Sequence, residues 1–313
     1  MALRLIMPNS FRLPKNFLAP ISEYTNSPFR LLCQKHGCNS VIVPLVNATA
    51  IARRADAVSE LFIDKREKNV GVQLFGSAPS DFKIAAKKIT ENFPKIKFLD
   101  INCGCPMENI IAVGAGASLL NNPKRVCEII SAAKSSGYPV SVKMRLLPTI
   151  DKTVDFCKMI EKAGADFIIV HGRKPEQFYS GSADWGAIKK IHEEISLPLV
   201  GNGDIKTRAE GESRVSEGFC DSFMIGREAM RNPLCFENRN LQSFDEQKKI
   251  FFEYLRIAEK TTCIGITDAR QKALFFFRGC KNCASLRAAI SQAKTMAQLV
   301  STINKYFYEN YNS

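Results

Sequence analysis

The N-terminal part of the sequence lacks a long run of apolar residues. Its first twenty residues are interrupted by Pro8, Arg12, Pro14 and Lys15. Secretory signals and membrane-spanning helices both need an unbroken apolar segment, so we expect neither of them and no contact with a membrane. The sequence therefore predicts a cytoplasmic protein.

A paired cysteine framework is also missing, although the chain has 11 cysteines among 313 residues. They are scattered and follow no export signal, so we expect most of these thiols to be reduced. Cys280 and Cys283, with Cys263 nearby, have a spacing that also serves zinc or iron–sulfur sites. Because no fourth ligand can be assigned, we interpret them as free or buried thiols and predict no metal, with a metal site as the alternative.

The charge is strongly unbalanced, with 44 Lys and Arg against 31 Asp and Glu, a formal net charge of +13. Hydrophobic residues make up 45% and charged residues 24%, as in ordinary globular proteins. An excess of positive charge suits a polyanionic partner such as nucleic acid, although it is weak support when taken alone.

Short β-rich runs recur along the first three quarters of the chain, separated by segments with helical periodicity. The eight runs are 17–20, 41–46, 70–76, 97–104, 140–146, 167–172, 197–204 and 222–227. Alternation of this kind predicts a parallel sheet with helices outside it, and eight repeats predict an α/β protein with a closed (β/α)₈ TIM barrel. No GxGxxG motif follows the first run, which argues against an open dinucleotide-binding sheet.

The alternating pattern stops after Pro233. Residues 241–313 show only helical patterns and carry 11 Lys and Arg against 6 Asp and Glu. We predict a barrel over residues 1–240 and an all-helical domain over residues 241–313. The positive charge of this tail either binds a partner or is a solvated helix face.

Polar side chains follow several of the predicted strands, at the end where (β/α)₈ enzymes place their chemistry. Cys105 lies beyond the fourth run, between Gly104 and Pro106. Cys103 has the opposite strand parity from Asn102 and is expected to pack behind the strand. The other strand-end candidates are Gln73, Lys143, Arg145, His171 and Arg173. We expect them to converge on one rim, whereas His36 and His192 lie in helical segments and are expected to be structural.

The last two strand ends indicate a phosphate-bearing cofactor. Asn202, Gly203 and Asp204 follow the seventh run, and Gly226 and Arg227 follow the eighth. Loops at these positions often bind phosphate, glycines let backbone N–H groups approach an anion, and arginine offers a bidentate fork. A lysine at the end of the fifth strand suits a flavin, because a cation near the N1/O2 edge stabilises the reduced ring.

Several motifs, in order across the whole barrel, resemble the tRNA-dihydrouridine synthase family of FMN enzymes. They are LAPISEYTNSPFR (18–30), VGVQLFGSAP (70–79), LDINCGCP (99–106), GAGASLL (114–120), VKMRL (142–146), VHGRKPEQFYSGSADW (170–185), GNGDI (201–205) and MIGREAMRNP (224–233). The tail motif LRAAISQAKT is also similar to the C-terminal helical RNA-binding domain of this family, with weaker specificity.

The resemblance implies that NADPH or NADH reduces FMN, and that the flavin then delivers hydride to C6 of a uridine in tRNA. It identifies Cys105 as the acid that protonates C5; an ordinary thiol, with a pKa of about 8.5, keeps its proton at neutral pH. It also implies a tRNA-binding role for residues 241–313, and we expect a monomer. The implied FMN-binding residues are Pro20, Ile21, Ser22, Gln73, Lys143, His171, Asn202, Gly203, Asp204, Gly226 and Arg227. The implied uridine and tRNA contacts are Asn102, Arg145, Arg173 and Tyr179.

Two stretches depart from the family pattern. Ile21 replaces the usual Met and is still expected to pack beneath a flavin, whereas Glu23 and Tyr24 are expected to alter the edge of the site. Residues 111–113 lack the basic residue often found before GAGASLL, which would weaken a phosphate contact or change the uridine that is chosen.

Two other functions remain open on the sequence. One is an FMN-dependent barrel oxidoreductase acting on a small molecule, of the dihydroorotate dehydrogenase type, for which the basic helical tail has no purpose. The other is a non-catalytic RNA-binding protein, for which the set of strand-end residues has none. Flavin uptake and salt-sensitive tRNA binding would distinguish them.

Overall fold

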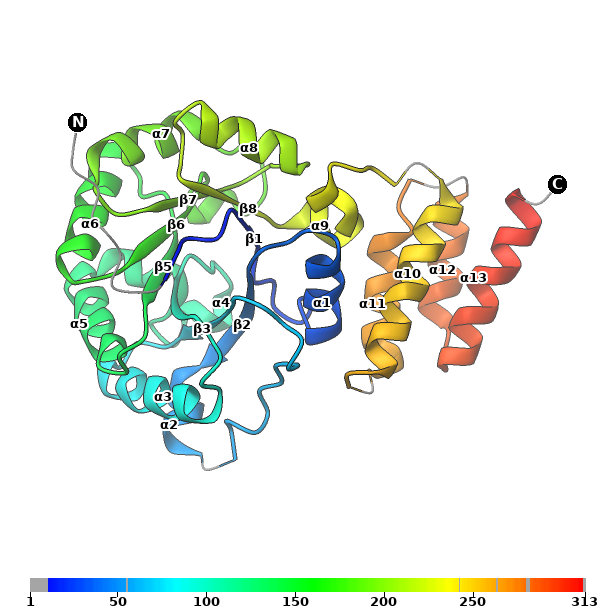
Figure 1. The fold of residues 1–313 in the computed structure, drawn as a ribbon, viewed down its shortest axis with the longest axis horizontal. Helices are drawn as coiled ribbons and strands as arrows, with labels where there is room; N and C mark the ends of the chain where they lie inside the picture. The colour runs from blue at the N-terminus through cyan, green and yellow to red at the C-terminus, as the bar shows by residue number, and fades with distance from the viewer. Residues whose placement is uncertain (1–10, 55, 242, 263, 280–281, 312–313) are drawn as a thin grey trace.

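The fold is a barrel of eight parallel strands enclosed by helices, with a group of four helices at one side (Figure 1). The computed structural model describes residues 11–54, 56–241, 243–262, 264–279 and 282–311. The strands are β1 (Asn16–Leu18), β2 (Val41–Asn47), β3 (Val70–Phe75), β4 (Phe98–Cys103), β5 (Val140–Arg145), β6 (Phe167–His171), β7 (Leu199–Asn202) and β8 (Ser222–Ile225).

The strand order is β1-β8-β7-β6-β5-β4-β3-β2, with every pair parallel. The remaining gap between β1 and β2 is bridged beside Phe17, where the Leu18 N–H donates to the Ser40 carbonyl at 2.9 Å. Each of the eight predicted runs overlaps one strand. The prediction of a TIM barrel followed by helices is confirmed.

Side chains on alternate strand positions fill the barrel interior in layers. The N-terminal layer is apolar and includes Phe17, Phe98 and Phe167, none of them exposed. A Cβ on Gly71 would lie 2.3 Å from the Phe98 ring, so the neighbouring strand needs glycine there. Toward the C-terminal ends of β3, β4, β5 and β7 the inward side chains become polar, which brings polar groups to that mouth of the barrel.

Helices and short turns connect the strands and cover the outside of the barrel. Many begin with a side-chain cap: Asn26 caps the first helix and Thr149 the sixth, each accepting a backbone N–H three residues later. The helices are α1 (Ser27–Lys35), α2 (Ala48–Arg53), α3 (Pro79–Asn92), α4 (Glu108–Ile111), α5 (Pro123–Lys134), α6 (Ile150–Lys162), α7 (Trp185–Glu194), α8 (Arg208–Ser216) and α9 (Arg227–Arg231), with 3-10 turns η1 (Gly116–Asn121), η2 (Pro175–Gln177) and η3 (Pro233–Glu237).

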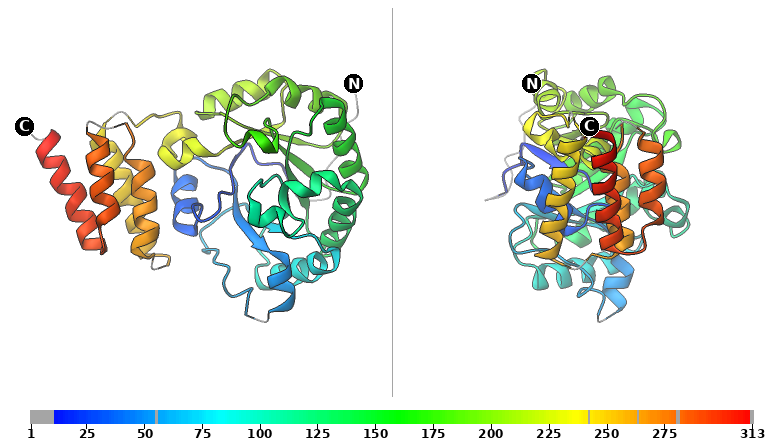
Figure 2. Two further views of the ribbon diagram at one scale, coloured as in Figure 1. Left: turned by 180° about the vertical axis from the view of Figure 1, so that it is seen from behind. Right: turned by 90° about the vertical axis from the view of Figure 1, so that its right-hand side faces the viewer.

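Four helices follow the barrel: α10 (Phe244–Glu259), α11 (Ile266–Phe276), α12 (Cys283–Gln292) and α13 (Met296–Tyr311). Figures 1 and 2 show them as a separate bundle beside α1 and α9. Aromatic rings build the core of the bundle: the Phe277 ring lies 5.0 Å from that of Phe244 and 5.5 Å from that of Phe251, measured between centroids. The division into domains at residues 240 and 241 stays a prediction. Among the described residues, no helix has both the length and the apolar character that crossing a membrane requires.

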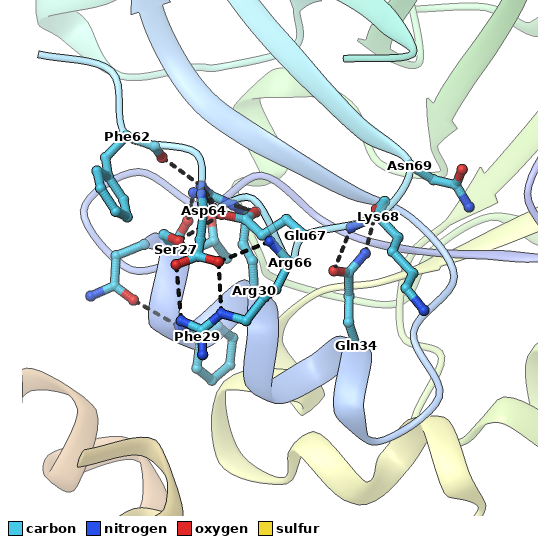
Figure 3. A network of polar contacts seen from close by, with 12 residues as sticks. Ser27, Phe29, Arg30, Gln34, Phe62, Asp64, Arg66, Glu67, Lys68 and Asn69 are labelled. Carbon is cyan, nitrogen blue, oxygen red and sulfur yellow. Dashed lines mark hydrogen bonds and ion pairs between the residues drawn. The ribbon is translucent and has the colours of Figure 1, made fainter. Parts of the chain in front are cut away.

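A buried ion pair fastens α1 to the segment before β3 (Figure 3). The Arg30 guanidinium donates to both carboxylate oxygens of Glu67, at 2.6 and 3.0 Å, and the two side chains are 2% and 0% exposed. Arg30 also donates to the carbonyls of Thr25 and Phe62, and the Ser27 hydroxyl donates to Glu67. The pair is therefore fully hydrogen-bonded, as a buried pair of charges has to be.

Tyr24 lies at the contact between barrel and bundle, so the prediction that it shapes the edge of the site is wrong. It is 1% exposed, its hydroxyl donates to the Met230 carbonyl at 2.8 Å, and its ring packs against Phe275. The ammonium of Lys272 on α11 lies 4.2 Å from the ring centroid. A turn over residues 21–25, with Glu23 at φ 59°, directs Tyr24 toward the bundle.

Candidate active site

The C-terminal ends of the strands bring the predicted polar residues to the mouth of the barrel. Lys143 on β5 and Asn202 on β7 are joined across β6 by a hydrogen bond of 3.4 Å from Nζ to Oδ1. Asn202 also donates to the Met224 carbonyl of β8 at 2.9 Å. Hydrogen bonds of Lys143 and Asn202, both predicted to bind a cofactor, thus connect β5, β7 and β8 at the mouth.

Cys105 lies in a short loop directly after β4 and is partly exposed. The Oδ1 atom of Asn102 accepts the N–H of Gly104 at 3.1 Å and that of Cys105 at 3.0 Å. The Cys105 carbonyl accepts the N–H of Ala117 at 2.9 Å, which fixes the returning segment η1 against the loop. Cys103 is fully buried, as predicted. The loop is therefore held from both sides by hydrogen bonds, and Cys105 remains partly exposed.

A hydrogen-bonded chain beneath this loop includes a carboxylate that sequence analysis missed. Asn102 donates through Nδ2 to Gln73 Oε1 at 2.8 Å, and Gln73 donates through Nε2 to Asp100 Oδ2 at 2.7 Å. Asp100 is 0% exposed. The sequence did contain an indication of this role, because Asp100 occupies an inward position of an otherwise apolar strand. Buried carboxylates are rare unless they have hydrogen-bond or ion-pair partners.

Burial sets the electrostatics of the mouth. Desolvation raises the pKa of Asp100, while hydrogen bonds from Ser141 and Gln73 and the charge of Lys143 pull it back down. Desolvation lowers the pKa of Lys143, and Arg145 lowers it further, whereas Asp100 opposes both effects. An ammonium in such surroundings gains from any anion that reaches it.

His171, at the end of β6, is 7% exposed and has its Nε2 atom 3.5 Å from the Arg173 guanidinium. Burial is the main cause that lowers the pKa of His171 to about 2, and the cations Lys143, Arg145, Arg173 and Arg227 add to it. The imidazole is therefore neutral near neutral pH and offers a hydrogen bond rather than a charge.

Two arginines bind one carboxylate beside the β7 loop. Arg173 holds both oxygens of Asp204 at 2.8 Å, and Arg227 donates to Oδ1 at 2.8 Å. Partial burial by itself would raise the pKa of Asp204, but the hydrogen bonds from Arg173 and the Ala183 backbone, with both positive charges, lower it. Arg227 is the more exposed arginine, so it is the one able to turn toward an incoming phosphate.

The loop after β6 is held by residues predicted to bind substrate. Arg145 donates to the carbonyls of Lys174 and Phe178, and Arg173 donates to those of Ser180 and Gly181. Tyr179 is half exposed, with the guanidinium carbons of Arg145 and Arg227 at 5.7 and 4.6 Å from its ring centroid. Arg145 and Arg227 thus position Tyr179 at the mouth. Direct contact of Arg145, Arg173 and Tyr179 with substrate stays a prediction.

The turn after β1 completes the rim. The Ala19 N–H donates to the Ile225 carbonyl of β8, and the Ile21 N–H donates to the Thr25 hydroxyl. Ile21 packs against the apolar cluster inside the barrel, while Pro20 is partly exposed and Ser22 is exposed. An apolar side chain beneath and polar groups at the edge suit a flat ring such as a flavin.

The mouth fits a phosphate-bearing flavin by the chemistry of its donors. Lys143 and Arg227 supply positive charge, His171 and Gln73 supply neutral hydrogen-bonding groups, and Gly203 leaves space at the β7 turn. Gly203 has φ 131°, and a Cβ there would lie 2.5 Å from the Ala183 Cβ and 3.2 Å from the His171 ring. Only glycine allows this close approach beside His171, one of the residues predicted to bind the cofactor.

Replacing Gly203 by alanine is expected to weaken flavin binding about tenfold, because strain of about 1–3 kcal/mol arises at the turn. The dissociation constant for FMN, measured by quenching of flavin fluorescence, checks this. Gly218→Ala is the matched control: Gly218 has φ 76° and no atom within 4 Å of an added Cβ. Equal effects of the two changes on FMN binding would contradict a specific role of the β7 turn.

No group of three or more metal-ligating side chains occurs within the described parts of the chain. Cys263 and Cys280 lie outside the described residues, and Cys283 is partly exposed at the start of α12. His36 hydrogen-bonds Glu237, and His192 hydrogen-bonds a backbone carbonyl, consistent with structural roles.

Comparison with known proteins identifies the family. A family model described as dihydrouridine synthase (Dus) matches residues 17–310. A "Probable tRNA-dihydrouridine synthase" of Aquifex aeolicus (strain VF5) is 29% identical over 310 residues, covering 95% of this chain and 97% of the relative. The Homo sapiens "tRNA-dihydrouridine(20a/20b) synthase [NAD(P)+]-like" is 30% identical over 223 residues, covering 70% of this chain and 69% of the relative.

Among solved structures, a complex of 2-naphthoyl-CoA reductase superposes with a TM-score of 0.54 at 12% identity, over 72% of this chain and 49% of that chain. At this identity the likeness shows the barrel fold alone. The family model spans both the strand-end residues and the helical bundle, and the Aquifex aeolicus relative covers nearly the whole chain. The chain therefore belongs to the dihydrouridine synthase family.

Proposed function

We propose that this protein is a tRNA-dihydrouridine synthase that reduces the C5=C6 bond of a uridine in tRNA, using FMN that is reduced by NADPH or NADH. The observation that carries the proposal is the accessible Cys105 thiol, held at the barrel mouth that Lys143, His171 and Arg227 also line. Acting in the cytoplasm as a monomer belongs to the same proposal.

The residues around the mouth divide between cofactor and substrate. Pro20, Ile21 and Ser22 would border the flavin ring, and Gln73, Lys143 and His171 would meet its polar edge. Asn202, Gly203, Asp204, Gly226 and Arg227 would enclose its phosphate. The chemistry that FMN would supply at this site, when bound and reduced, is a hydride for C6 of the uracil.

The protein itself supplies the proton for C5, from the Sγ atom of Cys105. The backbone on both sides of this residue is hydrogen-bonded, so the thiol is held in place before substrate arrives. Asn102 and Tyr179 border the same opening and are the proposed uracil and tRNA contacts. A fixed acid next to the reacting carbon avoids the cost of ordering it during the reaction.

The helical bundle is the proposed tRNA-binding part. Residues 241–313 have five more positive than negative charges, and Lys248 and Arg256 line an open cavity of about 450 Å³ between α10 and α13. Asp245 and Glu259 also line this cavity, so the attraction to the phosphate backbone is argued from the net positive charge of the whole segment. Affinity for tRNA should then fall steeply as salt concentration rises.

The experiment that tests the function follows the flavin of the purified protein. We expect a yellow protein whose spectrum bleaches with NADPH under anaerobic conditions and recovers when unmodified tRNA is added, with dihydrouridine found by mass spectrometry. Yellow protein that is indifferent to tRNA would instead identify an oxidoreductase of a small molecule. If the protein takes up no flavin, RNA binding without catalysis would be the only remaining function of the three.

Replacing Lys143 by methionine is expected to weaken FMN binding and to slow uridine reduction, each about tenfold or more, because the mouth loses its partly buried cation. Binding is measured by flavin fluorescence and turnover by dihydrouridine content. Lys158→Met is the control, since Lys158 forms an exposed pair with Glu194 on the outer helices. Unchanged FMN affinity in Lys143→Met would remove this lysine from the flavin site.

A further inference from the structure

Asp100 is a carboxylate inside the barrel that the proposed chemistry does not use. It sits in the middle of β4, fully buried, with Ser141 Oγ at 2.5 Å from Oδ1 and Gln73 Nε2 at 2.7 Å from Oδ2. Burial raises the pKa of Asp100 to about 7, and a proton on this carboxyl would lie on Oδ1, which faces the Ser141 hydroxyl. The Oδ2 atom therefore accepts the Gln73 N–H in both protonation states. Asp100 therefore dictates which end of the Gln73 amide faces it.

The orientation of the Gln73 amide determines that of the Asn102 amide. With its NH₂ group committed to Asp100, Gln73 presents its carbonyl oxygen to Asn102, and the Asn102 NH₂ group donates to it at 2.8 Å. Gln73 and Asn102 are 1% and 7% exposed, so water has little access to satisfy a reversed arrangement. The orientation of each amide follows from the one before it.

The chain ends at the loop of the proposed acid. Because its NH₂ group faces Gln73, Asn102 presents Oδ1 to the loop and accepts the N–H groups of Gly104 and Cys105 at 3.1 and 3.0 Å. A reversed Asn102 would point donors at donors and leave both N–H groups without this acceptor. The hydrogen bonds thus run in one direction, from the loop to the carboxylate.

We propose that Asp100 is a positioning residue for the uridine reduction proposed above: through the Gln73 and Asn102 amides it fixes the loop that holds Cys105. It touches neither substrate nor flavin in this role. The proposal rests on the proposed function for its catalytic meaning and on the hydrogen-bonded chain for its structural content, so the two can be tested apart.

The first test replaces Asp100 by leucine, which has a similar size and accepts nothing. Hydrogen exchange of the Gly104 and Cys105 amides, read by mass spectrometry or NMR on the full-length protein, is expected to accelerate about tenfold or more. Turnover should fall by a similar factor in kcat with KM for tRNA unchanged. Ser141→Ala is the matched control, because it removes the other hydrogen bond to Asp100 and leaves the chain to the loop intact.

Exchange that is unchanged in Asp100→Leu, or accelerated equally in Ser141→Ala, would overturn the proposal. Alkylation of Cys105 by iodoacetamide gives a second readout that needs no tRNA, and its rate should change in Asp100→Leu only. If the wild-type protein fails to reduce uridine but these readouts behave as stated, the proposed function fails and the structural role of Asp100 stands.

A second pair of variants covers the case in which Asp100→Leu does not fold. In Asn102→Asp, a carboxylate faces each side of the Gln73 side-chain amide. Only the NH₂ group of that amide can donate, so its carbonyl oxygen faces an acceptor and one hydrogen bond is lost. Adding Asp100→Asn reverses the whole chain: Asn at position 100 donates to Gln73, and Gln73 donates to Asp at position 102, which still accepts from the loop. We expect the double variant to regain the melting temperature and amide protection lost in Asn102→Asp; a double variant no better than the single one would refute the directional chain.

Discussion

Replacing Cys105 by alanine is expected to lower the turnover of tRNA by about 10²–10⁴-fold, the usual contribution of a positioned general acid. FMN content and tRNA affinity should stay near those of the wild type, because the backbone N–H and carbonyl of residue 105 make the hydrogen bonds that hold the loop, and alanine keeps both. Dihydrouridine formation under single-turnover conditions, measured by mass spectrometry, checks the result.

Cys103→Ala is the control for Cys105→Ala. Cys103 is two residues away and fully buried against the outer helices, and burial raises its pKa far above that of an ordinary thiol. Its removal should cost some stability and leave turnover intact. Normal turnover in Cys105→Ala would exclude Cys105 as the acid, and a collapse in Cys103→Ala alone would mean that the acid had been assigned to the wrong cysteine.

The barrel could be predicted from the sequence because its strands are short apolar runs at regular intervals, and such periodicity is a local property. The rim residues could be predicted for a related reason. Once the eight strands are assigned, Gln73, Asn102, Lys143 and His171 must lie at the same end of a parallel barrel, whatever the details of packing.

Contacts between distant elements could not be predicted in this way. Tyr24 faces the bundle because of a turn with Glu23 at positive φ, and nothing in the spacing of the motif announces that turn. Arg145 and Arg173 hold carbonyls of the loop after β6, and nothing in the order of the strands indicated these bonds. Their contact with substrate, implied by the family resemblance, stays a prediction. The role of Asp100 in the hydrogen-bonded chain depends on the register that pairs Gln73 of β3 with Asp100 of β4, and only the folded barrel defines that register.

Replacing Glu67 by alanine is expected to lower the free energy of unfolding by about 3–5 kcal/mol, because it leaves the Arg30 guanidinium buried without its counter-ion. Arg30 is 2% exposed and takes both oxygens of Glu67, so no rearrangement brings water to it without opening the segment before β3. Urea unfolding followed by circular dichroism measures the change.

The Arg66 and Asp64 pair is the matched control for this prediction. It lies in the same network (Figure 3), but Arg66 is 44% exposed. Arg66→Ala should therefore cost about 0–1 kcal/mol. A loss in Glu67→Ala no larger than in Arg66→Ala would mean that burial of the ion pair has little energetic consequence.

The same change should also reach the flavin site. Arg30 donates to the Thr25 carbonyl at 2.8 Å, and the Thr25 hydroxyl accepts the Ile21 N–H at 3.1 Å, so the ion pair supports the turn after β1 that carries the proposed ring contacts. Glu67→Ala should thus weaken FMN binding at temperatures where the protein is still folded. The double variant Arg30→Met/Glu67→Leu removes both charges together and should recover much of the lost stability. Because it also lacks the Arg30 hydrogen bond to Thr25, its FMN affinity should stay low, which separates the support of the turn from stability of the fold.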